Sequence, residues 1–531
     1  MNRHNVFGAT HRAAKKDDGE NKMKTIGILG IAAFAVVSAI SPSLAQKSKD
    51  TLRMPVSDPD AGIDTYGLPS SFANVWGPSV YDFLLSFDPK QGKFIGHLAK
   101  SFTLTNPTTY EFDLRTDVKW HDGQAFSADD VVYTISYLID PKVKLRYKAY
   151  WDWVQSVEKL GPNKVRLVAK QPSVDGLMYI AMRTPIYPKH AHGVAENKLD
   201  FASHPVGTGP LRITQLDQNT GIVGERYKDY VANAVHAASG VGKIVAEPIK
   251  DMGTLTAAML TGQVDVATDL PPDQAKALVD SGKFELTLAP PGVGYSFIGF
   301  PSKGANNVKA LGDARVRTAI MKAIDRDAVV DVKFGAVAKG IKPLEALCSK
   351  EQLGCGFTKQ APKYDPAGAK KLLAEAGYAD GFDVVISCFA AQAAEATAAA
   401  GMLRAVGIRA TVRQHPTAQR VQLIKAGKVD IGYYGWSGGG MFDVSGQLGR
   451  HVDSKEYDDP ELYKLAAIAD PLMDDAPRRA AVTKIFDRLT EEAHAFAMAP
   501  NRPVFTHTKD VKLNASGVRA EQINPHEFGW K

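Results

Sequence analysis

The chain has 531 residues, which is too long for one hydrophobic core and predicts two or three lobes. Hydrophobic residues make up 44% and charged residues 23%, a balance that is typical of a globular protein. The formal net charge of +6 is small for this length, and no stripe of Lys and Arg alternates with aromatic residues, so we expect no nucleic acid partner.

Residues 23–45 have the layout of a secretory signal, with a short basic start, an apolar run at 26–40 and small residues at 41–45. The apolar run is shorter than the ~20 residues that cross a bilayer, which favours a cleavable signal over a membrane anchor. We expect cleavage after Ala45, with residues 1–22 as an upstream extension. No cysteine near the cut offers a site for lipid attachment, so we expect a periplasmic protein without a transmembrane segment in its mature chain.

The chain has three cysteines. Cys348 and Cys355 bracket a short loop, and in an oxidising compartment such a pair closes a disulfide worth about 2–3 kcal/mol. The alternative is a pair of metal ligands, which lacks further Cys or nearby His residues. Cys388 lies in a strand-like run at residues 382–389 and is expected to be a buried thiol.

Strand-like and helix-like segments alternate along the mature chain, which predicts an α/β fold with several sheets. Residues 110–115 alternate apolar and polar side chains, as a half-buried strand does. Further strand-like runs cover residues 164–169, 207–214, 283–288, 295–300 and 429–434. Helix starts are marked by Ser127, by Asp313 and by the Asp-Pro pairs at 365–366 and 459–460. A long helix is expected from Pro477 to about Ala495.

Residues 435–439 fit the G-x-S-x-G pattern of a hydrolase, with Ser437 as the nucleophile and a strand-like run before it. The partners that would complete a triad are Asp443 or Asp453, and His494 or His507. A nucleophile elbow turns directly into a helix, whereas the residues from 440 to 446 start a helix poorly, and His494 lies within the expected long helix. The pattern therefore favours a glycine-rich loop that lets the backbone approach a ligand.

Two further patterns suggest nucleotide or metal chemistry and are rejected. Residues 237–244 resemble a P-loop but lack its first glycine and its closing Ser or Thr, so they predict a loop before a strand. His190, His192 and His204 lie in a polar, proline-rich stretch, which favours a solvated loop over a metal site. We expect no catalytic residue, no cofactor and no metal.

Several segments together, in their order and spacing, resemble the family 5 extracellular solute-binding proteins, which serve peptide, nickel and related ABC importers. The resemblance covers residues 52–518, and its most specific part spans residues 98–133, including the Trp-His-Asp-Gly sequence at 120–123. The other matching segments are residues 80–85, 207–210, 260–266, 313–326 and 371–377.

This resemblance implies a two-lobed periplasmic binding protein fold of class II, with an extra subdomain and a ligand cleft between the lobes. Lobe I is expected at residues 47–71, 205–291 and 503–531, an inserted subdomain at 72–204, and lobe II at 292–502. Residues 503–507 form a last strand-like run. If this strand returns to lobe I, several strands connect the lobes, an arrangement that permits closure around a ligand.

The resemblance also implies which residues contact the ligand. In peptide binders of this family the ligand backbone pairs with a segment of lobe II that corresponds to Trp436, Ser437, Gly438 and Gly439. Gly439 stands where an acidic residue usually pairs with the peptide ammonium, and a buried ammonium needs a partner. Either Asp443 serves instead, or the ligand is not held by a free amine, which leaves blocked or cyclic peptides, opine-like conjugates, saccharides and metal chelates open.

The opposing wall of the site is expected in lobe I, in the loop at residues 70–74 and at the nearby tryptophan. Its ligand-binding candidates are Ser71, Phe72, Asn74 and Trp76. Trp436 would stack on the ligand, while Ser437 and Asn74 would form hydrogen bonds with it. Core packing is the alternative for Trp436 and Phe72.

We therefore expect a monomeric, non-enzymatic protein that captures a peptide or peptide-like small solute by lobe closure. Ligand contacts with both lobes would favour the closed form by differential affinity. A membrane permease with separate ATPase subunits would then import the solute. The rival functions are a secreted serine hydrolase that uses Ser437, and a ligand-sensing or chaperone module of the same fold. The ligand, its affinity and the permease remain open.

Overall fold

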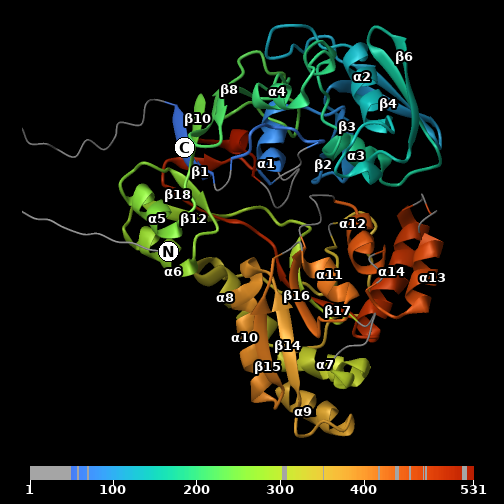
Figure 1. Cartoon of the computed structure of the whole chain (residues 1–531), viewed down its shortest axis with the longest axis vertical. Helices are drawn as coiled ribbons and strands as arrows, with labels where there is room; N and C mark the ends of the chain where they lie inside the picture. The colour runs from blue at the N-terminus through green and yellow to red at the C-terminus, as the bar shows by residue number, and fades with distance from the viewer. Residues whose placement is uncertain are drawn as a thin grey trace, which may run out of the picture. The chain divides into compact units, whose positions relative to one another are not determined.

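Helices and strands are interleaved along the chain, which confirms the predicted α/β class (Figure 1). The structure is a computed structural model that describes residues 50–531 except 57–58, 68–70, 302–307, 351, 417–418, 437–441, 454–455, 470–471, 473–474 and 517–522. The predicted secretory signal at residues 23–45 lies outside the described residues. All described residues fall within one unit of the chain, 45–531.

Two sheets are formed by segments that are far apart in the sequence. The first has the order β1 (Thr51–Val56), β10 (Lys243–Pro248), β9 (Gly221–Arg226) and β8 (Leu211–Asp217). The second has the order β11 (Val266–Thr268), β18 (Val504–Thr508) and β12 (Phe284–Leu288). The expected strand at 503–507 is thus β18, and it pairs antiparallel with both neighbours.

A four-stranded antiparallel sheet forms the core of residues 84–186. Its order is β4 (Ala99–Asn106), β5 (Thr109–Leu114), β7 (Lys164–Ala169) and β6 (Val154–Gly161). Helices α2 (Ala128–Ile139) and α3 (Gly176–Met182) contribute their apolar faces to the same core. Ser127 caps α2 in a capping box with Asp130, which confirms the predicted helix start.

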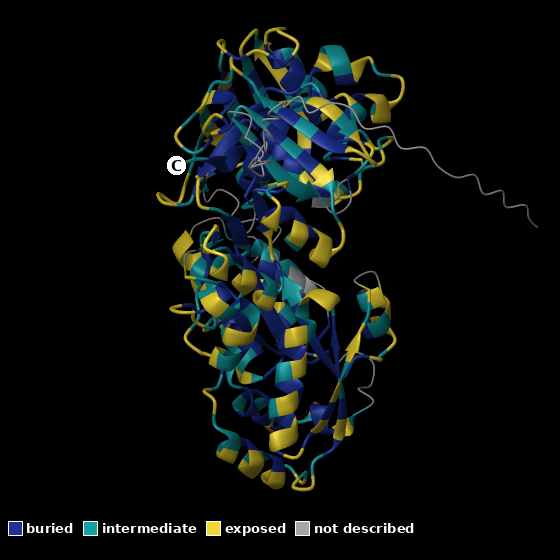
Figure 2. Ribbon diagram, turned by 90° about the vertical axis from the view of Figure 1, so that its left-hand side faces the viewer, coloured by how far each residue is buried: buried dark blue, intermediate teal, exposed yellow. Residues whose placement is uncertain are grey.

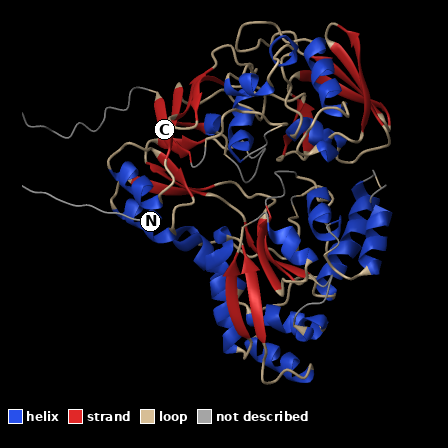
Figure 3. Cartoon of the chain, viewed as in Figure 1, coloured by secondary structure: helices blue, strands red, loops and turns tan. Residues whose placement is uncertain are grey.

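The largest sheet has five strands, and all of them except the edge strand β15 are mostly buried. Its order is β15 (Arg409–Gln414), β14 (Asp383–Cys388), β16 (Ile431–Trp436), β13 (Tyr295–Gly299) and β17 (Ala495–Pro500). Alternate side chains of β17 enter two different cores, with Phe496 and Met498 on one face and Ala495 and Ala497 on the other. Helices cover this sheet, and the strands are buried behind them (Figures 2 and 3).

The remaining helices and two short hairpin-like pairs complete the described part. The helices are α1 (Ser71–Val80), α4 (Lys198–Ser203), α5 (Met252–Leu260), α6 (Pro272–Asp280), α7 (Ala314–Ala323), α8 (Arg326–Phe334), α9 (Pro366–Glu375), α10 (Ala393–Ala405), α11 (Arg420–Lys425), α12 (Ser445–Leu448), α13 (Pro460–Ala469) and α14 (Asp475–Glu491). The strand pairs are β2 (Leu85–Asp88) with β3 (Lys93–Gly96), and β19 (Val511–Leu513) with β20 (Phe528–Trp530).

One predicted helix end is wrong. The last long helix ends at Glu491 and not near Ala495, where β17 begins, so His494 lies in the turn between them. The turn is made by Ala493, whose φ of 51° is left-handed, and by the amide of His494, which donates to the carbonyl of Leu489 at 2.9 Å. No glycine marks this turn, so the sequence carries no stop signal.

The described residues include the three cysteines and the histidines that were considered for a metal site. Cys348 and Cys355 are joined by a disulfide, and Cys388 is a free, buried thiol in β14. The expectation of a solvated histidine loop is wrong for His192, which is buried and bonds to the Tyr133 hydroxyl at 2.6 Å. Among the residues that the structure describes, no group of three or more potential ligand side chains is placed to hold a metal, and no helix is long and apolar enough to cross a membrane.

His121 joins two segments that the sequence separates widely. Its Nδ1 accepts the amide of Gly207 at 3.2 Å, and its Nε2 bonds to the carbonyl of Gly209 at 2.9 Å. Gly207 is required here because a Cβ would lie 1.8 Å from the carbonyl oxygen of Val80. This close packing buries the imidazole and lowers the pKa of His121 to about 4.

We expect the protein to lose stability in acid because of His121. Between pH 6.5 and pH 4 the unfolded chain binds a proton at this residue and the folded protein does not, so the free energy of unfolding falls by about 3 kcal/mol across that window. Urea unfolding of the wild type and of His121→Gln at pH 7, 5.5 and 4 measures this contribution. An equally steep pH dependence in both proteins would contradict it.

Candidate ligand-binding site

The described residues line a cavity of about 1130 Å³. Its size suits a small molecule or a short peptide. Its walls come from several segments, at residues 65–66, 73–78, 147–151, 182–185, 268–275, 332–336, 390–395 and 501–505.

Arg183 follows α3 and lines this cavity. Its amide donates to Tyr179 O at 2.8 Å, which continues the last turn of α3 and fixes the start of the side chain. Its Nε is buried without a hydrogen bond, and no described side chain forms an ion pair with the guanidinium. Desolvation lowers the pKa of Arg183, yet a guanidinium keeps its charge at neutral pH. A partly buried charge without an ionic partner is costly, so this group is prepared for an anion.

Aromatic side chains surround the Arg183 guanidinium. Its Cζ lies 5.6 Å from the ring centroid of Tyr150, which favours a cation over the ring face. Tyr150 in turn packs against Tyr179, Tyr147 and Trp151, with ring centroids 5.2, 5.5 and 5.8 Å apart. Tyr147, Tyr150 and Trp151 also line the cavity, so they provide flat apolar surface next to the charge.

The strands that return from the C-terminal part close another wall of the cavity. Asp269 follows β11 with a left-handed φ of 53°. Its amide donates to Val504 O at 2.8 Å, and its carboxylate accepts the amide of Val504 at 3.0 Å. Arg502 donates from Nε and Nη2 to the carbonyl of Ala289, at 2.9 and 2.8 Å. Both charged side chains line the cavity while these bonds hold neighbouring segments together.

Lys333 on α8 and Glu395 in the first turn of α10 form a charge pair at the cavity. Their Nζ and Oε1 atoms are 3.5 Å apart. The other carboxylate oxygen of Glu395 accepts the Ser296 hydroxyl at 2.6 Å and the Tyr433 hydroxyl at 3.1 Å. Burial raises the pKa of Tyr433 well above its usual value, so this hydroxyl stays protonated and donates. Glu395 is therefore already neutralised by the protein.

In the predicted wall, residues 71–74 belong to a helix and not to a loop. Phe72 and Trp76 stand four residues apart on α1, so they share its inner face, and both are buried in a core cluster. Asn74 is exposed and lines the cavity, whereas Phe72 and Trp76 are not among the lining residues. The side chain of Ser71 is outside the description. Ligand contact by these residues stays a prediction, and Asn74 is placed for it.

The predicted lobe II segment is described only at its start. Trp436 ends β16, is half-buried, and its Nε1 is buried without a hydrogen bond from any described residue. Gln392 packs beside the preceding Gly435 and lines the cavity, and its Oε1 is likewise buried without a partner among the described residues. Ser437, Gly438 and Gly439 lie outside the described residues, so their contacts with a ligand stay predictions.

Asp443, the expected substitute partner for a ligand ammonium, is engaged elsewhere. Its two carboxylate oxygens accept from Nη1 and Nη2 of Arg478 on α14, at 2.9 and 2.6 Å. Both side chains are 7% exposed, and Asp443 does not line the cavity. Binding an ammonium here would require this buried pair to break.

Comparison with known proteins places the chain in a family. The model for the middle part of the bacterial extracellular solute-binding proteins, family 5, matches residues 93–459. This is more than half of the chain. The protein belongs to family 5. The match confirms the resemblance inferred from residues 98–133 and the shorter segments.

Relatives of this family 5 protein include two that are named glutathione-binding protein GsiB. The protein from Pectobacterium atrosepticum is 27% identical over 359 residues, which cover 67% of this chain and 66% of that protein. The protein from Shigella dysenteriae is 28% identical over 425 residues, covering 77% and 78%. NikA from Brucella suis, solved in complex with Fe(III)-EDTA, has a TM-score of 0.78 at 21% identity and covers 91% and 100% of the two chains. The structural likeness confirms the predicted periplasmic binding protein fold.

Sequence reasoning missed Arg183, although a signal for it was present. It is the only charged residue between Gly176 and Tyr187, an otherwise apolar stretch. A lone cation in such a stretch is partly withdrawn from water when the segment packs, and this type of residue is rarely buried without a partner. Tyr147, Tyr150 and Trp151 lie close together in the sequence and were overlooked in the same way.

Proposed function

We propose that this family 5 protein captures a small, carboxylate-bearing solute in the cavity beside Arg183 and delivers it to an ABC importer. Arg183 carries this proposal. A half-buried guanidinium whose Nε lacks a hydrogen bond and that has no anionic partner among the described residues gains one when a carboxylate or a similar planar anion binds, and such charge-assisted bonds are the strong ones. The aromatic side chains around it would cover the apolar parts of the same ligand.

The charges along the cavity favour an anionic ligand. Among its described lining residues three are cations, Arg183, Lys333 and Arg502, and two are acids, Asp269 and Glu395, which leaves one positive charge in excess. Electrostatic complementarity then favours a ligand with more carboxylates than ammonium groups. Glutathione, a peptide with two carboxylates and one amine, has this balance, and its name recurs among the relatives.

The ion pairs of the protein argue against an ordinary free peptide whose ammonium group is held at Asp443. That carboxylate is paired with Arg478, and Glu395 is paired with Lys333, while Asp269, the other acid of the cavity, accepts the amide of Val504. The proposed ligand is therefore recognised first by its carboxylate and not by its amine. Peptide-like solutes with an additional acidic group fit this description.

The transport role follows from the family and from the position of the cavity walls. Residues 182–185 and 390–395 face one cavity although they lie in segments predicted for the inserted subdomain and for lobe II. A ligand that contacts both would favour their approach, and the closed protein would dock on a membrane permease whose ATPase subunits drive uptake. We propose a periplasmic location for the mature protein.

The structure favours neither rival function. Ser437 lies outside the described residues. Of the triad partners considered for it, Asp443 binds Arg478, and His494 bonds to Asp459 at 2.9 Å. Ligand sensing without transport would use the same cavity. Only a test of whether a permease accepts the ligand-bound protein distinguishes sensing from import.

Native mass spectrometry of gently purified mature protein tests the proposal. We expect a bound anionic solute that is released on unfolding, and a loaded protein that is more stable by about 2.7 kcal/mol when the ligand is present at about 100 times its dissociation constant. A ligand-free mass, together with no change of melting temperature in a panel of mono-, di- and tricarboxylate solutes and peptides, would overturn it.

A further inference from the structure

Phe442 inserts into a core that otherwise belongs almost entirely to another part of the chain. It follows β16 by a few residues and is 6% exposed. Its ring centroid lies 5.3 Å from that of Phe87 on β2. Apart from Val293, all other buried members of this cluster lie between Leu84 and Ile186 (α12, which follows Phe442, lies beside α3 and β2 in Figure 1). Phe442 thus couples the segment after β16 to the part of the chain that carries Arg183.

The backbone of Phe442 is held by the loop that the disulfide closes. The carbonyl of Phe442 accepts the amide of Leu353 at 2.8 Å, and the amide of Val444 donates to the carbonyl of Leu353 at 3.1 Å. Leu353 itself packs against the cluster that contains Phe442. Cys348 and Cys355 close this loop around Leu353, so the crosslink limits how far Leu353 can move away. We call Phe442, Leu353 and residues 348–355 the clasp.

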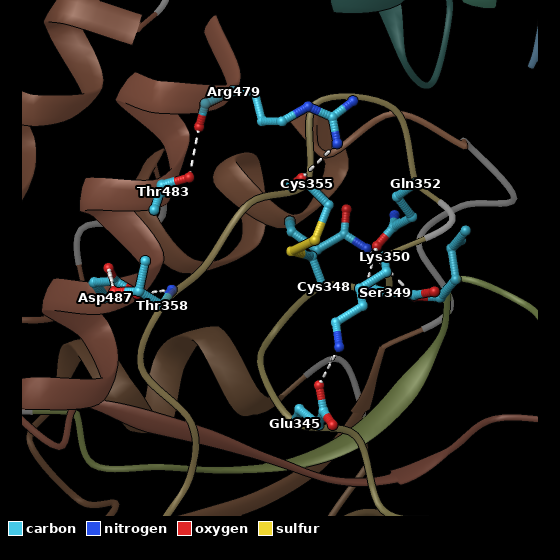
Figure 4. The surroundings of a disulfide bond; sticks show 12 residues. Glu345, Cys348, Ser349, Lys350, Gln352, Cys355, Thr358, Arg479, Thr483 and Asp487 are labelled. Atoms are coloured by element: carbon cyan, nitrogen blue, oxygen red, sulfur yellow. Dashed lines mark hydrogen bonds and ion pairs between the residues drawn. A yellow bond between two sulfur atoms is a disulfide. The ribbon is translucent and has the colours of Figure 1, made fainter. Parts of the chain in front are cut away.

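Helix α14 anchors the clasp from the other side. Arg479 donates to the carbonyl of Cys355 at 2.9 Å (Figure 4). Arg478, paired with Asp443 next to Phe442, also fills the space beside Gly354, where a Cβ would lie 2.4 Å from its Nη1. The positive φ of 74° at Gly354 fits the same requirement for glycine. The backbone bonds to Leu353, the Cys348–Cys355 disulfide and the two arginines of α14 together hold the segment that carries Phe442.

The cluster that receives Phe442 is also the support of the ligand site. Its members include four residues of α3, and the α3 helix packs against β2, the strand that carries Phe87. Arg183 is the residue that directly follows α3. The electrostatic attraction between Arg478 and Asp175, which precedes α3, adds a second link between the same two parts. Phe442 and the helix that places Arg183 therefore share one packed core.

We propose that Phe442 is a positioning residue for the ligand site: the disulfide-braced clasp holds α3, and with it Arg183, in the orientation that binds the anion. The inference rests on the proposed role of Arg183. Phe442 acts through packing and does not contact the ligand cavity, since it is not among the lining residues.

Amide hydrogen exchange, measured on the ligand-free protein, tests whether the clasp supports α3. In Phe442→Ala we expect the amides of residues 176–183 to exchange on the order of tenfold faster than in wild type, because their support is lost locally. Phe201→Ala is the matched control, since Phe201 is also 6% exposed but packs with Tyr81, Tyr187 and His192 in a different cluster. Phe442→Leu is expected to restore most of the protection, and Cys348→Ser with Cys355→Ser to lose part of it.

Binding kinetics provide the second readout, with reduced glutathione as the probe. We expect Phe442→Ala to accelerate dissociation on the order of tenfold with little change in association, and Phe201→Ala to leave both rates near wild type. Equal protection of the amides of residues 176–183 from hydrogen exchange in Phe442→Ala and Phe201→Ala would contradict the proposed role of Phe442. Failure of the wild type to bind glutathione or any carboxylate solute would overturn the proposed function, while the exchange data would still decide whether Phe442 supports α3.

Discussion

Replacing Arg183 by glutamine is expected to raise the dissociation constant for a carboxylate-bearing ligand about 100-fold or more, without loss of stability in the ligand-free protein. The guanidinium has no anionic partner among the described residues, so its removal costs the empty protein no ion pair and relieves a desolvated charge. In the complex the same change leaves the ligand carboxylate without its partner. Isothermal titration with glutathione, or with the solute that co-purifies, measures the first effect, and urea unfolding measures the second.

Arg146→Gln is the matched control for this experiment. Arg146 also lies over an aromatic ring, 5.4 Å from the centroid of Tyr147, but it is exposed and does not line the cavity. We expect its substitution to change affinity less than threefold, as for a rim charge. A ligand whose carboxylates are esterified should bind wild type and Arg183→Gln equally. Equal loss of affinity in the Arg146 and Arg183 variants would show that overall charge, and not a specific bond, attracts the ligand.

Asp443→Asn is expected to lower the free energy of unfolding by about 3–5 kcal/mol, because it leaves Arg478 as an uncompensated buried charge. Both side chains are 7% exposed, and two bonds of 2.6 and 2.9 Å join them. A double variant, Asp443→Leu with Arg478→Met, should recover most of the loss, since a well-packed apolar pair is often as stable as a buried ion pair. Urea unfolding of the three proteins provides the comparison.

An exposed ion pair serves as the control for the Asp443→Asn substitution. Asp327 and Lys342 are 3.4 Å apart with side chains that are 67% and 79% exposed, and we expect Asp327→Asn to change stability by at most about 0.5 kcal/mol. The experiment also separates two roles of Asp443. If Asp443→Asn unfolds like wild type but no longer binds ligand amines, the carboxylate belongs to the ligand site, which is one of the two alternatives drawn from Gly439.

Local signals predicted the regular elements well. Ser127, Asp313 and Asp365 each accept a backbone amide at the start of the helix that they were expected to cap. The run at 164–169 is β7, and the strand expected at 207–214 begins only at Leu211 because residues 207–210 pack against Val80 and His121. Caps and alternation act between residues that are close in the chain, so they are visible in the sequence.

The candidate site was predicted less well, and α1 shows the reason. Residues 70–74 were expected to form a loop facing the ligand, with Trp76 nearby. In the helix, the spacing of four residues directs the rings of Phe72 and Trp76 into the core, while Asn74 emerges at the cavity. The side that each residue faces depends on the helix, and ligand contact by this segment stays a prediction.

By itself the sequence determined the α/β class, the family and the helix starts, since each rests on nearby residues or on the order of motifs along the chain. Only the tertiary structure decided which charged side chains are paired with an opposite charge and which are not. Asp443 is neutralised by Arg478 and Glu395 by Lys333, whereas Arg183 has no such partner among the described residues. The free energy of a buried charge depends on every group that packs around it, and those groups come from segments tens of residues apart in the chain.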